Sequence, residues 1–139
     1  MVDRAVIKTK LVFADARLQE LKFHSKVSLD RFRNDSTLQA AILHHLQVGV
    51  QSCMDIASHI VADESWGVPG TSKDLFEFLR QHRVITATLA AEMKEVVGFR
   101  NLVVHAYDKL DLRRAHANLP AYRRAIARFL KAVVVYAKL

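Results

Sequence analysis

Apolar residues recur at helical spacing along most of the chain, and this pattern predicts five helical segments. The first covers about residues 3–24. The second begins near Asp35 and Ser36, which are residue types that cap helix N-termini, and continues to about residue 64. The stretch "SWGVPGTS", with two Gly and one Pro, predicts a loop, and a short helix follows over about residues 73–81.

The fourth predicted helix opens after Thr86 and runs through "ATLAAEMKEVVGFRNLVVHAY", and the fifth runs from Asp111 to the C-terminus. Gly98 lies inside the fourth helix and predicts either a kink or the close approach of a partner chain or RNA. Pro120 lies inside the fifth and predicts a kink or a split near residues 118–119. Alternating strand patterns are nearly absent. We therefore expect an all-α fold, an antiparallel four-helix bundle with a short additional helix, as one domain over residues 1–139.

Composition narrows the class of protein. Of 139 residues, 51% are hydrophobic and 25% are charged, which is typical of globular domains. No apolar run reaches the roughly 18 residues of a membrane span, and the first residues do not resemble a signal peptide. Cys53 is the only cysteine, which excludes an internal disulfide and a zinc site built from cysteines. We expect a cytoplasmic protein.

The net charge of +7 is unevenly distributed. Residues 1–99 hold 12 Lys or Arg and 12 Asp or Glu, whereas residues 100–139 hold 9 and 2, so the last forty residues carry the whole excess. Such a basic segment could attract a polyanion such as RNA, or an acidic partner protein, or be a solvated face. The candidate RNA-binding side chains are Arg113, Arg114, Arg123 and Arg124.

The stretch "GFRNLVVHAYD", from Gly98 to Asp108, separates into two faces on a helical wheel. The apolar arc holds Phe99, Leu102, Val103 and Ala106. The other arc holds Arg100, Asn101, Val104, His105, Tyr107 and Asp108, with Tyr107 about 20° from Arg100. The wheel predicts that the first arc is buried and that the second is a polar face.

An arginine and a histidine on one face suit a phosphodiester. Arginine is a planar, permanent cation for phosphate oxygens, and histidine moves protons near neutral pH. The alternative from the residues alone is a solvated helix surface. Asn101 could instead be a local cap at a kink. Asp108 could bond Asn101 or a basic residue of a partner chain, with no catalytic role.

The segment "RNLVVHAY" reads Arg, four residues, His, one residue, Tyr, and it resembles the signature of HEPN-domain ribonucleases, in particular the HepT toxins. The order of "LQAAILHHLQVGVQSCMDIASHIV", a loop with Pro, "LFEFLRQHRVIT" and "MKEVVGFRNLVVHAYDKLD" is similar to HepT-like proteins from about Leu38 to Asp111. Pro120 departs from the uninterrupted last helix of that family.

This resemblance implies a homodimeric HEPN bundle that is a metal-independent endoribonuclease and the toxin of a toxin–antitoxin pair. It implies that Arg100 and His105 are catalytic, that Asn101 supports them, and that an MntA-like nucleotidyltransferase antitoxin adenylylates Tyr107. It implies no cofactor. The alternative is a non-catalytic HEPN module that docks a nucleotidyltransferase or binds nucleotide.

The remaining histidines, the cysteine and the tryptophan are expected to have structural roles. His44, His45 and His59 lie on the second predicted helix without the Glu-x-x-His pattern of a di-iron bundle, so we expect surface or interface positions and no metal. Cys53 is expected to be a small buried hydrophobe, and Trp66 to anchor its loop on the bundle.

Overall fold

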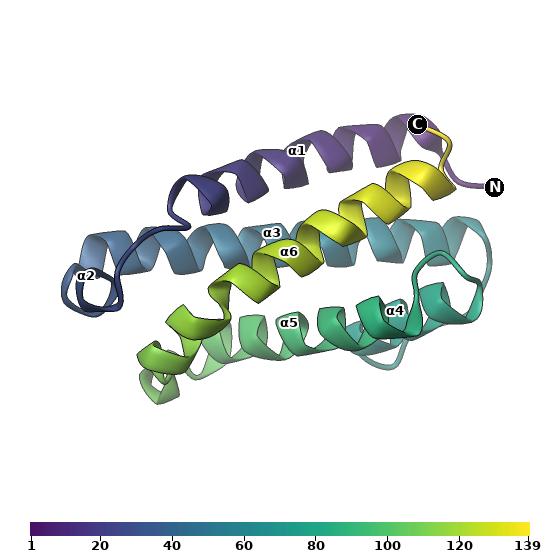
Figure 1. Cartoon of the computed structure of the whole chain (residues 1–139). Helices are drawn as coiled ribbons and strands as arrows, with labels where there is room; N and C mark the ends of the chain where they lie inside the picture. Colours follow the sequence, from purple (N-terminus) through teal and green to yellow (C-terminus); the bar gives the residue numbers. More distant parts are fainter.

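The computed structural model describes all residues from 1 to 139 and contains six α-helices and one 3₁₀ turn. The elements are α1 (Arg4–Phe23), α2 (Leu29–Asn34), α3 (Ser36–Asp63), α4 (Ser72–Gln81), α5 (Ala87–His105), η1 (Tyr107–Lys109) and α6 (Leu112–Tyr136). Figure 1 shows the four long helices α1, α3, α5 and α6 side by side, each antiparallel to the one before it. The predicted all-α bundle is confirmed, with α2 and α4 as short additions. None of the helices combines the length and the apolar character that crossing a bilayer requires.

The helix starts follow from their capping residues. The Asp3 carboxylate accepts hydrogen bonds from the backbone N–H groups of Ala5 and Val6, and the Asp35 carboxylate accepts one from Leu38 at 3.0 Å. These bonds satisfy N–H groups that have no partner within the first helical turn. Helix α6 starts in the same way, because Asp111 accepts hydrogen bonds from the backbone of Arg113 and Arg114.

Helix α3 is the centre of the core. It contacts every other α-helix, and 13 of its 28 residues are buried. Cys53 is among them, as predicted, and burial in apolar surroundings raises the pKa of its thiol far above the ordinary value. Across the core, the rings of Phe76 from α4 and Phe129 from α6 meet edge to face with centroids 5.5 Å apart.

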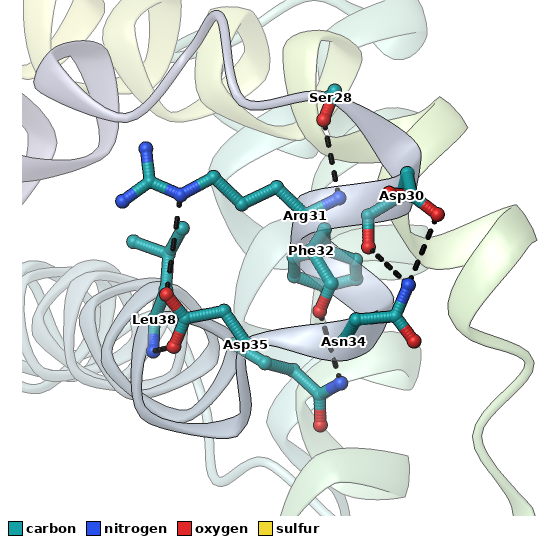
Figure 2. A network of polar contacts seen from close by, with 8 residues as sticks. Ser28, Asp30, Arg31, Phe32, Asn34, Asp35 and Leu38 are labelled. Atoms are coloured by element: carbon teal, nitrogen blue, oxygen red, sulfur yellow. Dashed lines mark hydrogen bonds and ion pairs between the residues drawn. The ribbon is translucent and has the colours of Figure 1, made fainter.

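Helix α2 was not predicted from the sequence. Its six residues are too few for a periodic pattern, and tertiary contacts hold it: Phe32 is fully buried, and the Ser28 hydroxyl accepts a hydrogen bond from the Arg31 N–H at 3.1 Å. The Asn34 amide donates to both the backbone carbonyl and the carboxylate of Asp30 (Figure 2). These local bonds and one buried ring fix the turn between α1 and α3.

The loop between α3 and α4 is anchored by Trp66, as predicted. The indole stacks on the His82 ring with centroids 4.0 Å apart and meets the Tyr136 ring edge-on. Gly67 has φ = 144°, and a Cβ there would lie 3.0 Å from the Phe78 ring, so glycine is required on both grounds.

Neither Gly98 nor Pro120 splits its helix, so the split predicted near residues 118–119 is wrong. Helix α5 runs unbroken through Gly98, and the group that approaches this residue is Lys73 of α4, whose Nζ would lie 3.5 Å from a Cβ. Helix α6 continues through Pro120 and is not split near residues 118–119. Proline there still removes the hydrogen bond that residue 120 would donate to the His116 carbonyl. Packing of the rest of α6 against the bundle outweighs that loss.

Candidate functional site

The polar motif lies where α5 ends, at the end of the bundle opposite the two termini (Figure 1). The helix ends at His105, because Ala106 leaves helical geometry at φ −144° while its N–H still donates to the Leu102 carbonyl at 2.9 Å. Tyr107 and Asp108 therefore belong to the 3₁₀ turn η1. The prediction of one helix through Tyr107 is wrong, and so is the wheel position of Tyr107 and Asp108.

Arg100 is held against α3 by its guanidinium. Its Nη2 donates to the Gln51 side-chain oxygen at 2.7 Å, and its Nη1 donates to the Asn101 side-chain oxygen at 3.1 Å. Gln51 is itself oriented, since its amide donates to the Asp55 carboxylate at 3.0 Å. The buried Arg100 Nε makes no hydrogen bond. The guanidinium is therefore held in place by the neutral amide of Gln51, which Asp55 orients. No carboxylate pairs with the cation directly.

Asn101 supports Arg100 and makes no hydrogen bond with His105 or Asp108. The contact between the two residues is an amide oxygen that accepts from the guanidinium. The predicted bond between Asp108 and Asn101 is not formed.

Tyr107 is hydrogen-bonded to the N-terminal part of α3. Its hydroxyl donates to the Gln39 side-chain oxygen at 2.7 Å, while its ring is 46% exposed. Gln39 is only 8% exposed, and its amide donates to the Phe32 carbonyl of α2 at 3.1 Å. One buried glutamine therefore joins α2, α3 and the 3₁₀ turn that carries Tyr107.

The two anchoring glutamines separate Tyr107 from Arg100. Gln39 and Gln51 are twelve residues apart on α3, which is about 18 Å along the helix axis. The phenol hydroxyl and the guanidinium thus point to different parts of α3. The wheel's prediction that Tyr107 lies beside Arg100 is corrected by this geometry.

His105 is exposed and takes part in no hydrogen bond or ion pair. Its ring is available to a ligand, as a proton-transferring group must be. On the apolar arc, Phe99 and Val103 are buried as predicted, whereas Leu102 is 45% exposed. The prediction that Leu102 is buried is wrong, because its side chain lines an open pocket between α5 and the start of α6.

Gln39 and Gln51 were missed from the sequence. Gln39 lies on the apolar stripe of α3, four residues before the buried Leu43. A polar residue at such a position was the sequence signal that could have identified it. Gln51 lies in the polar row Gln47, Gln51, Asp55, which resembles an ordinary solvated face. No sequence signal distinguished it.

The four basic residues of α6 do not form one cluster. Arg113 and Arg114 lie in the first turn of α6, and Arg123 and Arg124 follow about 15 Å further along the axis. Their guanidinium groups make no hydrogen bond or ion pair. Arg113, Arg114 and Arg124 are exposed, whereas Arg123 is half-buried and lines a small pocket between α1 and α6.

The histidines of α3 occupy mixed positions. His44 is exposed, and His59 and His45 are half-buried. Burial lowers the pKa of His45 although its Nε2 lies 4.0 Å from the Glu20 carboxylate, which acts in the opposite direction. The His45 ring also lies parallel to that of His24, with centroids 6.5 Å apart. No group of three or more His, Cys, Asp or Glu side chains is placed so that it could hold a metal ion.

Comparisons with known proteins agree with this architecture. An mRNA nuclease HepT from Shewanella oneidensis is 40% identical over 82 residues, which are 59% of this chain and 62% of that relative. A tRNA nuclease HepT from Aphanizomenon flos-aquae is 29% identical over 110 residues, covering 79% of this chain and 75% of the relative.

Among solved structures, the tri-AMPylated Shewanella oneidensis HEPN toxin in complex with MNT antitoxin is 28% identical, with a TM-score of 0.85 over 97% of this chain and 99% of that one. A toxin–antitoxin complex with AMP-PNP is 27% identical, with a TM-score of 0.86 over 94% and 98%. The ribonuclease HepT-like family matches residues 15–133, which is most of the protein. The chain belongs to the ribonuclease HepT-like family.

Proposed function

We propose that this protein is the toxin of a toxin–antitoxin pair and an endoribonuclease that cleaves RNA without a metal. The observation that carries the proposal is the C-terminal end of α5, which carries both the fixed guanidinium of Arg100 and the exposed ring of His105. A HepT-like relative acts as an mRNA nuclease and another as a tRNA nuclease, which supports RNA as the substrate class.

The chemistry needs more than one chain supplies. RNA cleavage without a metal requires a base that takes the 2′-hydroxyl proton, an acid that protonates the leaving 5′-oxygen, and a cation near the pentavalent phosphorus. An isologous homodimer repeats each residue across its two-fold axis. One His105 then acts as base, the other as acid, and the paired Arg100 side chains stabilise the phosphorane. The products are a 2′,3′-cyclic phosphate and a 5′-hydroxyl.

Tyr107 is the proposed site at which the antitoxin controls the activity. The solved complexes of similar toxins hold an MNT or MntA antitoxin, and one of these toxins is tri-AMPylated. In this chain the Tyr107 hydroxyl is the nucleophile that would take AMP from ATP held by a nucleotidyltransferase antitoxin, losing its proton as pyrophosphate leaves. The residue is 46% exposed and therefore accessible. Esterification removes the only hydrogen that Tyr107 donates to Gln39, so modification also loosens the 3₁₀ turn beside His105.

The remaining assignments follow from this role. Residues 1–139 act as one HEPN-like domain, no cofactor takes part, and the protein works in the cytoplasm, where its RNA substrate and its antitoxin are made. Of the four basic residues, Arg113 and Arg114 are closest along the chain to the motif and are the first candidates to guide RNA.

Expression of the chain alone and with a nucleotidyltransferase from a HepT/MntA-type pair tests the proposal. We expect growth arrest with RNA cleavage from the chain alone, loss of both in His105→Ala, and protection by the active nucleotidyltransferase. Harmless expression together with no cleavage by the purified protein would instead identify a non-catalytic module.

A further inference from the structure

A second group of basic side chains lines the pocket between the C-terminal end of α1, the loop before α2, and the middle of α6. This pocket has a volume of about 130 Å³. Its polar lining consists of His24, Ser25, Lys26, His116 and Arg123, and it contains no carboxylate. Leu21, Ile42 and Leu119 supply an apolar floor.

The basic groups of this pocket have no counter-charge. Lys26 and Arg123 take part in no ion pair of the structure. The Nε of Arg123 is buried and has no acceptor, and the other nitrogens of the same guanidinium make no hydrogen bond either. A buried donor without an acceptor is costly, and cations gathered in a partly enclosed space repel one another. An anion in the pocket would accept a hydrogen bond from the unpaired donor and would offset the repulsion between the cations.

The pocket is held in shape by backbone contacts. His116 Nε2 lies 2.7 Å from the Val27 carbonyl, so this nitrogen donates and the ring is fixed against the loop. The ring also packs against buried Phe32 with centroids 5.8 Å apart. Pro120 lines the same pocket, and it is the residue that cannot donate to the His116 carbonyl. The break in backbone bonding of α6 therefore coincides with the pocket wall.

We propose that this pocket binds a single phosphate group. The size selects the ligand: pockets that enclose a drug-sized molecule have about 300–1,000 Å³, so 130 Å³ fits one phosphate and not a whole nucleotide. The chemistry agrees, because a guanidinium, an ammonium, a hydroxyl and an imidazole are the donors that phosphate oxygens accept from. The phosphate is either free or part of an RNA chain, and the proposal does not depend on catalysis by the motif.

The test is a calorimetric titration of inorganic phosphate into the full chain. The buffer is free of phosphate and contains about 150 mM KCl, which matches physiological ionic strength. We expect saturable binding of one phosphate per chain. Arg123→Gln should weaken it by about tenfold or more, which is the scale of a lost hydrogen bond to a charged group. Arg124→Gln is the matched control, because it removes the neighbouring positive charge, which lies outside the pocket. Phosphate binding by this variant should stay within about twofold of wild type.

Lys26→Gln provides a second variant at an exposed loop position that cannot disturb the core. It should also weaken phosphate binding, whereas His105→Ala should leave it unchanged, which separates this site from the proposed catalytic one. No saturable binding, or equal affinities in Arg123→Gln and Arg124→Gln, would overturn the proposal.

A non-cleavable 2′-O-methyl oligonucleotide distinguishes the two sources of phosphate. If the group belongs to RNA, inorganic phosphate should compete with the oligonucleotide and Arg123→Gln should weaken its binding more than Arg124→Gln does. If the group is free phosphate, oligonucleotide binding should be the same in both variants while phosphate binding still differs.

Discussion

The hydroxyl of Tyr107 donates a hydrogen bond of 2.7 Å to the side-chain oxygen of the buried Gln39. In the proposed adenylylated state the same oxygen is bonded to phosphorus and has no hydrogen to donate. Two acceptors would then face each other, since the Gln39 amide nitrogen is already committed to the Phe32 carbonyl. If Tyr107 is modified as proposed, Gln39 is the residue through which the change would reach α2.

Tyr107→Phe separates toxicity from control. We expect the variant to remain toxic and to resist the nucleotidyltransferase, because no hydroxyl remains to be modified. Loss of the bond to Gln39 should lower the free energy of unfolding by only about 0.5–1.5 kcal/mol. Growth in the presence of the antitoxin measures the effect. Tyr122→Phe is the control that should still be neutralised, and neutralisation of Tyr107→Phe to the same degree would contradict the assignment.

Gln39→Leu removes both the acceptor of Tyr107 and the donor to Phe32. The buried Phe32 carbonyl then lacks a partner, so we expect the free energy of unfolding to fall by about 1–3 kcal/mol in urea denaturation. Gln47→Leu changes a half-buried glutamine on the same helix that makes no side-chain hydrogen bond, and it should have little effect. Equal losses in the two variants would show that the Gln39 contacts do not stabilise α2.

Gln51→Leu releases the Arg100 guanidinium. We expect the rate of RNA cleavage to fall by about tenfold to a hundredfold while the RNA-binding affinity changes little, because the charge remains but its orientation is lost. Single-turnover cleavage and equilibrium binding of a non-cleavable RNA separate the two quantities. Asp55→Asn should be mild, since an amide oxygen can still accept from Gln51. A large loss of RNA affinity in Gln51→Leu would point to a binding role for Arg100.

His105→Ala tests proton transfer directly. The expected loss of cleavage is about 10²–10⁴-fold, the usual contribution of a general acid or base. The melting temperature should not change, because the exposed ring makes no hydrogen bond in the structure. His44→Ala, another exposed histidine, serves as the control and should keep full activity. Undiminished cleavage by His105→Ala would exclude the proposed mechanism.

Glu77 gives the fold a predictable response to acid. Hydrogen bonds from Arg80 and then Lys94 hold the pKa of this carboxyl at about 2, below its ordinary value of 4.5. The folded pKa is depressed, so the stabilisation is present above about pH 4.5 and is lost as the pH falls toward 2.

The comparison of wild type with Glu77→Gln should therefore show a gap in melting temperature at pH 7 that closes between about pH 4.5 and pH 2. Glu95→Gln, at an exposed position on α5 without an ion pair, should show no such gap. A gap that stays constant down to pH 2 would mean that Glu77 stabilises the packing of α4 on α5 by other means.

The long helices were predictable from the sequence because each combines a capping residue with an apolar stripe, as at Asp3, Asp35 and Asp111. Helix α2 was not, since a six-residue segment held by one buried ring, Phe32, has no period to detect. Arg100 lies on the polar face of α5 as predicted, half-buried against Gln51 of α3.

The end of α5 shows where the pattern fails. Helical spacing continues through Tyr107, yet the backbone leaves the helix at Ala106, so a wheel drawn past His105 misplaces everything after it. The partners Gln39 and Gln51 come from a helix about fifty to seventy residues earlier in the chain, and only the packing of α5 on α3 brings them to the motif. Sequence spacing contains no information about such contacts.

The Arg4 side chain donates to the backbone carbonyls of Ala137 and Lys138, so the first and last helices are fastened together at the end of the bundle away from the motif (Figure 1). Neighbouring termini are the condition under which circular permutation succeeds. A short linker between residues 139 and 1 would therefore allow new ends to be opened in the exposed loop around Val68, leaving the connectivity of α5 and its 3₁₀ turn intact.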